Sequence, residues 1–348
     1  MTNSITVTCP GKVLILGGYL ILQKENKGIV LSTSSRFQCR IKPSTSLVIH
    51  FCHFPDRTIT NFSDNRALSI ISKTVVDHFP QFKMCFELFI DADSDFYSEG
   101  MTNGTYASSV SNVSKTGLGS SSAFIVSTVA AICAFNGLTC HEQIEILAQK
   151  ANIAIQGIGS GFDISCCVHG SQIYRKYFED QNIRTHIVDK FDLPDRHEMV
   201  LASADGHSRT PRMAKKVMQS ANGALWKEIC NLTNECIKYL CEFENAENVQ
   251  NISKKILDGY EILGESCGVE IVPKCRKRVL NLLFEVKGLL MCGIPGAGGY
   301  DAIYCIYSIK DPSTLAQIQN ILTSNSFSIL KSVHSNRGLE IETHEDAK

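Results

Sequence analysis

The chain has 348 residues and a mass of 38.4 kDa, and its 34 lysines and arginines nearly balance its 35 aspartates and glutamates. This balance argues against a protein that holds nucleic acid or an anionic membrane through bulk positive charge. Hydrophobic residues make up 44% of the chain and charged residues 20%, which excludes disordered and collagen-like classes. The length predicts about two domains, and we place their boundary in a polar passage, giving 1–195 and 196–348.

Fifteen cysteines are scattered along the chain, and their odd number prevents complete internal pairing. The start, from Met1 to Pro10, has no basic stretch followed by an apolar one, so we expect no secretory signal. We therefore predict free thiols and a cytoplasmic location.

The first β-prone runs, Ile5–Cys9 and Val13–Leu16, flank Pro10 and Gly11, and this pattern predicts a strand, a turn and a second strand. Further β-prone runs follow at 29–31, 37–41 and 47–51. Apolar residues at helical spacing then predict a helix over Arg66–Phe79.

Residues 91–114 are rich in small polar residues and predict a long exposed loop. The stretch Thr116–Cys140 carries no charged residue, but its strongly apolar part, Ala123–Phe135, is much shorter than the ~20 residues that a membrane span needs. We interpret it as a buried helix behind a polar loop. Thr139 and Glu142 have the spacing of a capping box, which predicts that the next helix starts at Thr139.

The second half opens with an apolar run, Met199–Ala204, and continues with apolar residues at helical spacing from Leu225 to Leu263. A further helix is expected over Lys274–Lys287, followed by strands at Leu289–Cys292 and Ala302–Tyr307. Strands and helices that are grouped, without regular alternation, favour an α+β fold over a doubly wound sheet.

The strongest candidate site is Lys115–Ala123, which leads directly into the apolar helix. Its glycines let the backbone curl tightly, and the first turn of the following helix presents N–H groups that suit phosphate oxygens. Lys115 adds a positive charge, and three hydroxyls there can reach a phosphate or a magnesium ion. The alternative is a glycine-serine loop that merely caps a buried helix.

Three other segments are weaker candidates. The glycine loop Ile294–Asp301 lets backbone approach a ligand closely, although it would also suit a long hairpin turn. Glycines hold Asp163 on a loop before an apolar run, where its carboxylate would orient a metal or a lysine; a plain turn is the alternative. Asp205–Arg212 joins hydroxyls and arginines to a helix that starts with Pro211, a composition typical of an anion site.

Three segments in this order, Pro10–Tyr19, Lys115–Ala123 and Ile294–Asp301, resemble the three motifs of the GHMP small-molecule kinases. The sequence is not that of a Walker A loop, because Gly11-Lys12 is followed by Val13. Within this superfamily the motifs are most similar to the fungal and plant phosphomevalonate kinases. Gly17-Gly18-Tyr19 stands where mevalonate kinases and galactokinases have Gly-Glu-His.

The resemblance implies an α+β GHMP kinase fold. Its N-terminal domain would be like the second domain of ribosomal protein S5, and its C-terminal domain would be ferredoxin-like. It also implies ATP-dependent phosphorylation of 5-phosphomevalonate to 5-diphosphomevalonate, with Mg²⁺ as the metal. Lys12 and Asp163 would be catalytic, with Lys12 also meeting the acceptor and Ser121 binding the metal. The nucleotide would meet Lys115, Gly117, Leu118, Gly119, Ser120, Ser121 and Ser122, and the acceptor would meet Ser208, Arg209, Thr210, Gly296, Ala297, Gly298 and Gly299.

Two alternatives stay open. A kinase for mevalonate or another alcohol would rely more on Asp163 as a general base. A catalytically silent protein would use the fold for contacts alone. We expect small-molecule substrates, no nucleic-acid or membrane partner, and a monomer or homodimer.

Overall fold

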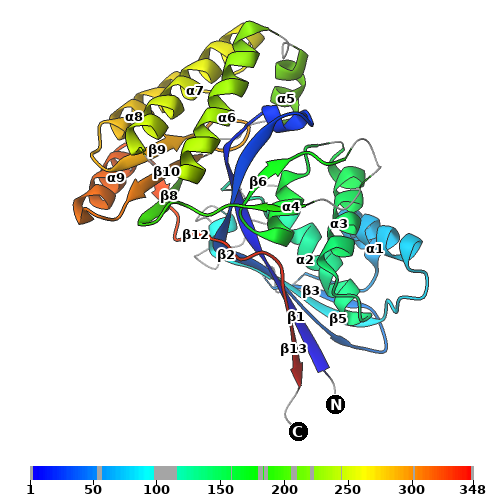
Figure 1. Ribbon diagram of the computed structural model, residues 1–348. Coiled ribbons are helices and arrows are strands. Elements are labelled where there is room, and N and C mark those ends of the chain that lie inside the picture. Colours follow the sequence, from blue (N-terminus) through cyan, green and yellow to red (C-terminus); the bar gives the residue numbers. More distant parts are fainter. Residues whose placement is uncertain are drawn as a thin grey trace.

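Two β-sheets organise the chain, and Figure 1 shows each with its own group of helices. The computed structural model describes residues 3–52, 57–97, 116–157, 159–178, 183, 187–204, 210–219, 223–243, 245–300 and 302–345. Strands and helices are mixed without regular alternation along the chain, so the predicted α+β class is confirmed.

The first sheet has the order β13-β1-β2-β5-β3-β4, with β12 and β6 paired to β2 and β7 paired to β6. Neighbouring strands are antiparallel, except that β3 runs parallel to β5. Four helices, α1 to α4, pack together beside this sheet (Figure 1). The strands are β1 (Asn3–Leu16), β2 (Lys27–Pro43), β3 (Val48–Phe51), β4 (Thr58–Ile59), β5 (Phe86–Ala92), β6 (Gln172–Arg175), β7 (Asp189–Lys190), β12 (His334–Ser335) and β13 (Glu340–Glu345), and the helices are α1 (Arg66–His78), α2 (Ser120–Phe135), α3 (His141–Gln156) and α4 (Phe162–His169).

The second sheet is antiparallel, with the order β11-β8-β10-β9. Its helices include α7 and α8, which contact β9, and α9, which contacts β10 and β11. The strands are β8 (His197–Ser203), β9 (Leu289–Gly293), β10 (Ala302–Ser308) and β11 (Ser328–Ile329), and the helices are α5 (Thr210–Gln219), α6 (Ala224–Glu242), α7 (Ala246–Cys267), α8 (Lys274–Phe284) and α9 (Pro312–Ser324). Short 3₁₀ helices lie at Leu20–Leu22, Phe62–Asp64 and Ser94–Phe96.

The end of the described chain returns to the first sheet, which the sequence did not predict. Strand β13 pairs with β1, and β12 pairs with β2. Arg36 on β2 supports this return, because its guanidinium donates to the Gly338 carbonyl at 2.7 Å and to Glu340 Oε2 at 3.0 Å. The division into 1–195 and 196–348 stays a prediction.

Strand β1 is continuous, so the predicted turn at Pro10 and Gly11 is wrong. The register shifts there: between the pairs Pro10↔Arg36 and Lys12↔Ser32, Gly11 stands opposite three residues of β2. Such an irregularity increases the local twist and re-aims the side chains next to it. Strand β1 therefore contains Pro10 and Gly11 and still continues through Lys12.

Helix α2 is buried on nearly every side, which explains why it lacks charged residues. Helix α3 begins at His141 with Cys140 as its N-cap, and no side chain caps it. The capping box placed Thr139 in the N-cap position, so that prediction is wrong by one residue. Of the predicted loop over 91–114, Asp91 and Ala92 lie in β5 and Ser94–Phe96 forms a 3₁₀ turn; residues 98–114 lie outside the described part.

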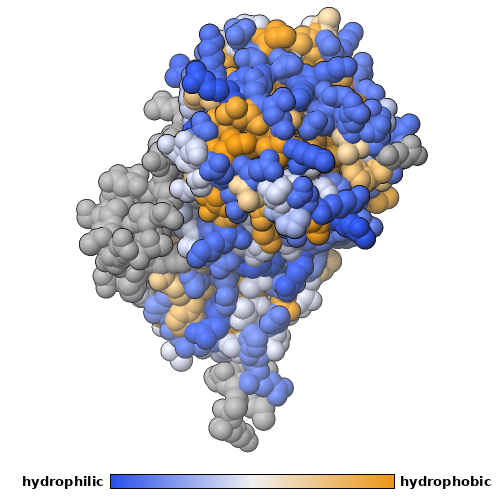
Figure 2. All heavy atoms as spheres, turned by 90° about the vertical axis from the view of Figure 1, so that its left-hand side faces the viewer, coloured by the Kyte–Doolittle hydropathy of each residue, from blue (hydrophilic) through white to orange (hydrophobic). Residues whose placement is uncertain are grey.

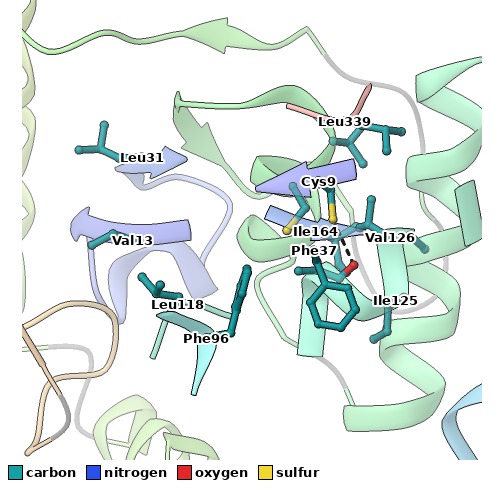
Figure 3. Packing of buried hydrophobic residues seen from close by; sticks show 14 of the residues in the cluster. Cys9, Val13, Leu31, Phe37, Phe96, Leu118, Ile125, Val126, Ile164 and Leu339 are labelled. Atoms are coloured by element: carbon teal, nitrogen blue, oxygen red, sulfur yellow. Dashed lines mark hydrogen bonds between the residues drawn. The ribbon is translucent and has the colours of Figure 1, made fainter. Parts of the chain in front are cut away.

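The core joins the first sheet to α2 and α4 (Figure 3). Leu118, Ile125, Val126 and Ile164 from the helical layer pack with β-strand side chains such as Val13, and Cys9 donates its thiol hydrogen to the Ala123 carbonyl at 3.1 Å. Burial raises the pKa of the Cys9 thiol well above its ordinary value. All fifteen cysteines are free thiols, as predicted.

The surface in Figure 2 is mainly hydrophilic, with apolar areas between the polar residues of its upper half. Among the described residues, no helix combines the length and the apolar character that crossing a membrane would require.

Candidate active site

Strand β1 and the residues after it bring the three candidate motifs together. The Lys12 backbone N–H donates to the Leu118 carbonyl at 2.8 Å, which attaches the second motif. The Gly296 N–H donates to the Leu14 carbonyl at 3.0 Å, and the Tyr19 hydroxyl donates to the Ala297 carbonyl, which attach the third. These hydrogen bonds thus hold the three segments together through residues that are more than 100 positions apart in sequence.

Lys12 lies at the centre of this arrangement. It follows the register shift in β1, is half-buried, and donates from Nζ to the Gly117 carbonyl at 3.2 Å. The same ammonium lies 5.4 Å from the centroid of the Phe162 ring, within the range of a cation–π contact. One charge therefore contacts both the loop before α2 and the start of α4.

Gly119 is the N-cap of α2 and packs directly against the Lys12 side chain. Its φ is +84°, in the left-handed region, and a Cβ placed on it would lie 2.6 Å from Lys12 Cε. The first-turn N–H groups of α2 have no acceptor within the helix, and the helix dipole makes this end positive. Together with Lys12 they form a site suited to phosphate oxygens.

We expect Gly119→Ala to lower kcat at least about tenfold, because the new methyl group displaces the Lys12 side chain. The matched control is Gly137→Ala beyond the other end of α2, where φ is +80° and no atom lies within 4 Å of the added Cβ. Both variants pay the backbone cost of a left-handed alanine, about 1–2 kcal/mol. Steady-state assays and thermal melts of both proteins test this: equal losses of activity would remove the steric explanation.

The three serines at the start of α2 differ in their surroundings. Ser120 and Ser122 are buried, and the Ser122 hydroxyl donates to the Gly119 carbonyl at 2.8 Å. Ser121 is half-buried, so among the three hydroxyls its oxygen is the most accessible donor to a metal. The Leu118 side chain belongs to the core, which leaves only its backbone for a nucleotide.

Asp163 is the second residue of α4, so its predicted position on a loop is wrong. The helix dipole favours a negative charge at this end of α4. The carboxylate is half-buried, and its Oδ1 accepts from the Ile164 N–H at 3.0 Å. Burial raises the pKa of Asp163 above its ordinary value, and the nearby Lys12 ammonium opposes that rise. The structure therefore brings the two predicted catalytic side chains into the same electrostatic environment.

The third motif forms the connection between β9 and β10, as its hairpin position predicted. Gly296, Ala297 and Gly298 are half-buried, while Gly299 is buried and donates its N–H to the Ile271 carbonyl at 2.9 Å. The loop is thus held on one side by the first motif and on the other by the segment before α8.

Four predicted site residues lie wholly or partly outside the described part of the chain. Lys115, Ser208 and Arg209 lie outside the described residues, and Thr210 is the first residue of α5, with its side chain outside them. The prediction missed Phe162, although it adjoins Asp163 in the sequence. It also assigned no role to the Tyr19 hydroxyl, which holds the third motif.

A cavity of about 50 Å³ lies between the first and third motifs, lined by residues that include Gly18, Tyr260 and Gly296. Sites for drug-sized ligands usually enclose ~300–1,000 Å³. This cavity is therefore too small for a nucleotide.

Comparisons with known proteins give matches over most of the chain. The model of the GHMP kinases N terminal domain matches residues 86–171, which include α2, α3 and α4, the helix that carries Asp163. A phosphomevalonate kinase of Saccharolobus solfataricus is 31% identical over 317 residues, covering 87% of this chain and 90% of that protein. A peroxisomal phosphomevalonate kinase of Arabidopsis thaliana is 25% identical and covers 87% and 90% of the two chains.

A solved structure shares the fold over nearly the whole length. The phosphomevalonate kinase of Streptococcus pneumoniae, in complex with phosphomevalonate and AMPPNP, superposes with a TM-score of 0.76 at 16% identity. The alignment covers 95% of this chain and 99% of that one.

Proposed function

Because the chain belongs to the phosphomevalonate kinase family of the GHMP kinases, we propose that it transfers the γ-phosphoryl group of ATP to 5-phosphomevalonate. The products are ADP and 5-diphosphomevalonate, which places the enzyme in the mevalonate pathway of isoprenoid biosynthesis. The observation that carries this proposal is the position of Lys12, whose ammonium contacts both the loop before α2 and the start of α4.

The acceptor explains why a lysine matters more than a strong base. A phosphate monoester has its second pKa near ~6, so at neutral pH it is largely a dianion and already nucleophilic. The barrier lies in bringing two anionic groups into line. Lys12 would neutralise and align the acceptor phosphate beside the γ-phosphate, and Asp163 would hold the lysine in place.

The nucleotide phosphates would lie at the start of α2. Backbone N–H groups from Gly117 to Ser121 would bind the β- and γ-phosphates. Lys115 would add a positive charge to this phosphate site. Mg²⁺ prefers hard oxygen donors and usually keeps several waters. The half-buried Ser121 hydroxyl and the Asp163 carboxylate are donors of that kind, so these residues would hold it. When bound, the ion neutralises phosphate charge.

The acceptor would lie against the third motif. The third motif has only small side chains from Gly296 to Gly299, so its backbone can approach the acceptor closely. Ser208, Arg209 and Thr210 would complete the contacts to its phosphate or carboxylate, since arginine suits planar, paired recognition of such anions.

A coupled assay of ADP release tests the choice of acceptor. With ATP and Mg²⁺, we expect turnover with phosphomevalonate and at most about 1% of that rate with mevalonate or galactose. A preference for mevalonate would support the alternative of an alcohol kinase. No ADP above background with any of the three would support a silent protein.

The pH dependence of kcat/KM should show the protonation of the Asp163 carboxylate. The pKa of Asp163 lies above the ordinary value of 3.8, so its carboxylate becomes protonated at a higher pH than that of an exposed aspartate. Because the acceptor itself titrates near ~6, we compare wild type with Asp163→Asn. The ratio of their kcat/KM values should be constant near neutral pH and fall toward one as the pH drops through the raised pKa. A ratio independent of pH down to about 4 would contradict this.

We also propose a cytoplasmic location, which the fifteen free thiols support. The expectations of a monomer or homodimer, and of no nucleic-acid or membrane partner, stay predictions.

A further inference from the structure

A buried polar network lies behind the proposed active site, between α3 and the segment after β6. Glu145 and Gln149 occupy successive turns of α3 and are only 3% and 0% exposed. The Tyr177 hydroxyl donates to Glu145 Oε1 at 2.8 Å and accepts from Gln149 Nε2 at 3.0 Å. His169 Nε2 lies 2.9 Å from the other oxygen of Glu145. Both side-chain oxygens of Glu145 thus have partners, as buried polar groups require.

This network reaches the loop that leads into α4, the helix that carries Asp163. Gln149 Nε2 also donates to the Gly161 carbonyl at 2.8 Å. Gly161 is the N-cap of α4, and the same carbonyl accepts the Ser165 N–H at 3.1 Å as the first turn of the helix forms. One carbonyl oxygen therefore joins Gln149 to the start of the helix whose second residue is Asp163. Figure 1 shows α3 and α4 side by side.

The loop has little room to move against this network. Gly161 has a φ of +78°, and a Cβ placed on it would lie 2.6 Å from Phe178 Cε1 and 2.8 Å from the Gln149 amide. The preceding carbonyl, that of Ser160, accepts from the Tyr174 hydroxyl. Two successive carbonyls before Asp163 are therefore held by buried side chains.

The aromatic rings continue the contact toward Lys12. Tyr177 packs edge to face on Tyr174 at 6.2 Å between centroids, and Tyr174 packs on Phe162 at 6.4 Å. The Lys12 ammonium lies over Phe162. The side chains that hold the loop thus also support the ring beneath the lysine.

We propose that Gln149 is a positioning residue for the phosphoryl transfer. Oriented by Tyr177 and Glu145, its amide fixes the Gly161 carbonyl and thereby sets the Asp163 carboxylate against Lys12. The proposal rests on the proposed role of Asp163. A misplacement of about 1 Å in a catalytic group can cost about 100-fold in rate, so the effect should appear in kcat rather than in substrate binding.

Gln149→Met removes the donor at nearly constant side-chain size. A matched control exists at the other end of α4, where the buried Gln172 donates from Nε2 to the Gly170 carbonyl at 3.3 Å. Each variant loses one buried amide, so their thermal midpoints should fall by similar amounts. We expect Gln149→Met to lower kcat about 10- to 100-fold with KM values for both substrates within about threefold. Gln172→Met should stay within about twofold of the wild-type kcat. Equal kcat losses in the two variants would overturn the proposal.

A double-mutant cycle shows whether Gln149 acts through Asp163. In the Asp163→Asn background, Gln149→Met should lower kcat by less than about twofold. An undiminished loss would mean that Gln149 acts elsewhere, and the proposal would be wrong.

Crystal structures of Gln149→Met and Gln172→Met separate this proposal from the proposed function. We expect the Asp163 carboxylate to shift by about 1 Å in the first variant alone, and an unchanged position would overturn the positioning role. If wild type fails to phosphorylate phosphomevalonate, the proposed function fails, and the structures still decide whether Gln149 positions Asp163.

Discussion

Lys12→Met should lower kcat with phosphomevalonate by about 100- to 1,000-fold, the range found when one preorganised charge-stabilising donor is removed from an active site. The physical reason is that two anionic phosphates must approach each other, and the Lys12 ammonium contacts both the loop before α2 and the start of α4. The KM for phosphomevalonate should rise less than kcat falls, because repulsion is greatest in the transition state. Steady-state kinetics at saturating ATP measure both.

Lys73→Met is the matched control for this variant. Lys73 lies on α1, is 76% exposed and pairs with Asp77 at 2.8 Å. An exposed pair of this kind contributes little to stability, so the control should keep wild-type kinetics. Wild-type turnover in Lys12→Met would show that the lysine assignment is wrong.

Asp163→Asn should lower kcat at least about tenfold, equivalent to ~1.4 kcal/mol of transition-state free energy. The substitution removes the charge that we propose to hold Lys12 in place, but keeps an oxygen able to accept the Ile164 N–H. Because burial raises the pKa of Asp163, its charged form costs folding free energy at neutral pH. The variant should therefore melt no lower than wild type at pH 7, which separates a catalytic loss from unfolding.

Asp77→Asn serves as the control here, since this α1 carboxylate is 55% exposed. A loss below tenfold in Asp163→Asn, with normal melting, would reduce Asp163 to a minor role. A large fall in melting temperature would instead assign it to stability.

Much of the fold was accessible from local patterns. The helical spacing from Arg66 predicted α1, and the lack of charge in Ala123–Phe135 predicted the burial of α2. The hairpin around the third motif was predicted because glycines separate two apolar runs. These features depend on neighbouring residues, so the sequence shows them directly.

The features that the sequence did not show depend on contacts between distant residues. Pro10 and Gly11 looked like a turn, but three residues of β2 stand opposite Gly11 and let β1 continue to Lys12. The return of β13 to β1 rests on pairing across more than 330 residues. Gln149 looked like one more polar residue on α3, since its hydrogen bond to Gly161 becomes visible only once the helices are packed.

The sequence predicted the residues of the candidate site but not the contacts that bring them together. Motif resemblance selected Lys12, Asp163 and the glycine loops. It did not show that the backbone of Lys12 donates to Leu118, or that Gly119 packs against the Lys12 side chain. Those contacts place the Lys12 side chain beside the N-cap of α2, the positive end of that helix dipole. A nearly neutral chain can in this way present local positive potential to anionic phosphates.

The most direct test of the account is ³¹P NMR of the wild-type protein with ATP, Mg²⁺ and phosphomevalonate. We predict that the monoester signal disappears as two new coupled diphosphate signals arise beside those of ADP, in equal amounts, and that Lys12→Met slows all of these changes together. A monoester signal that persists while ATP is converted to ADP and inorganic phosphate would contradict phosphoryl transfer to this acceptor.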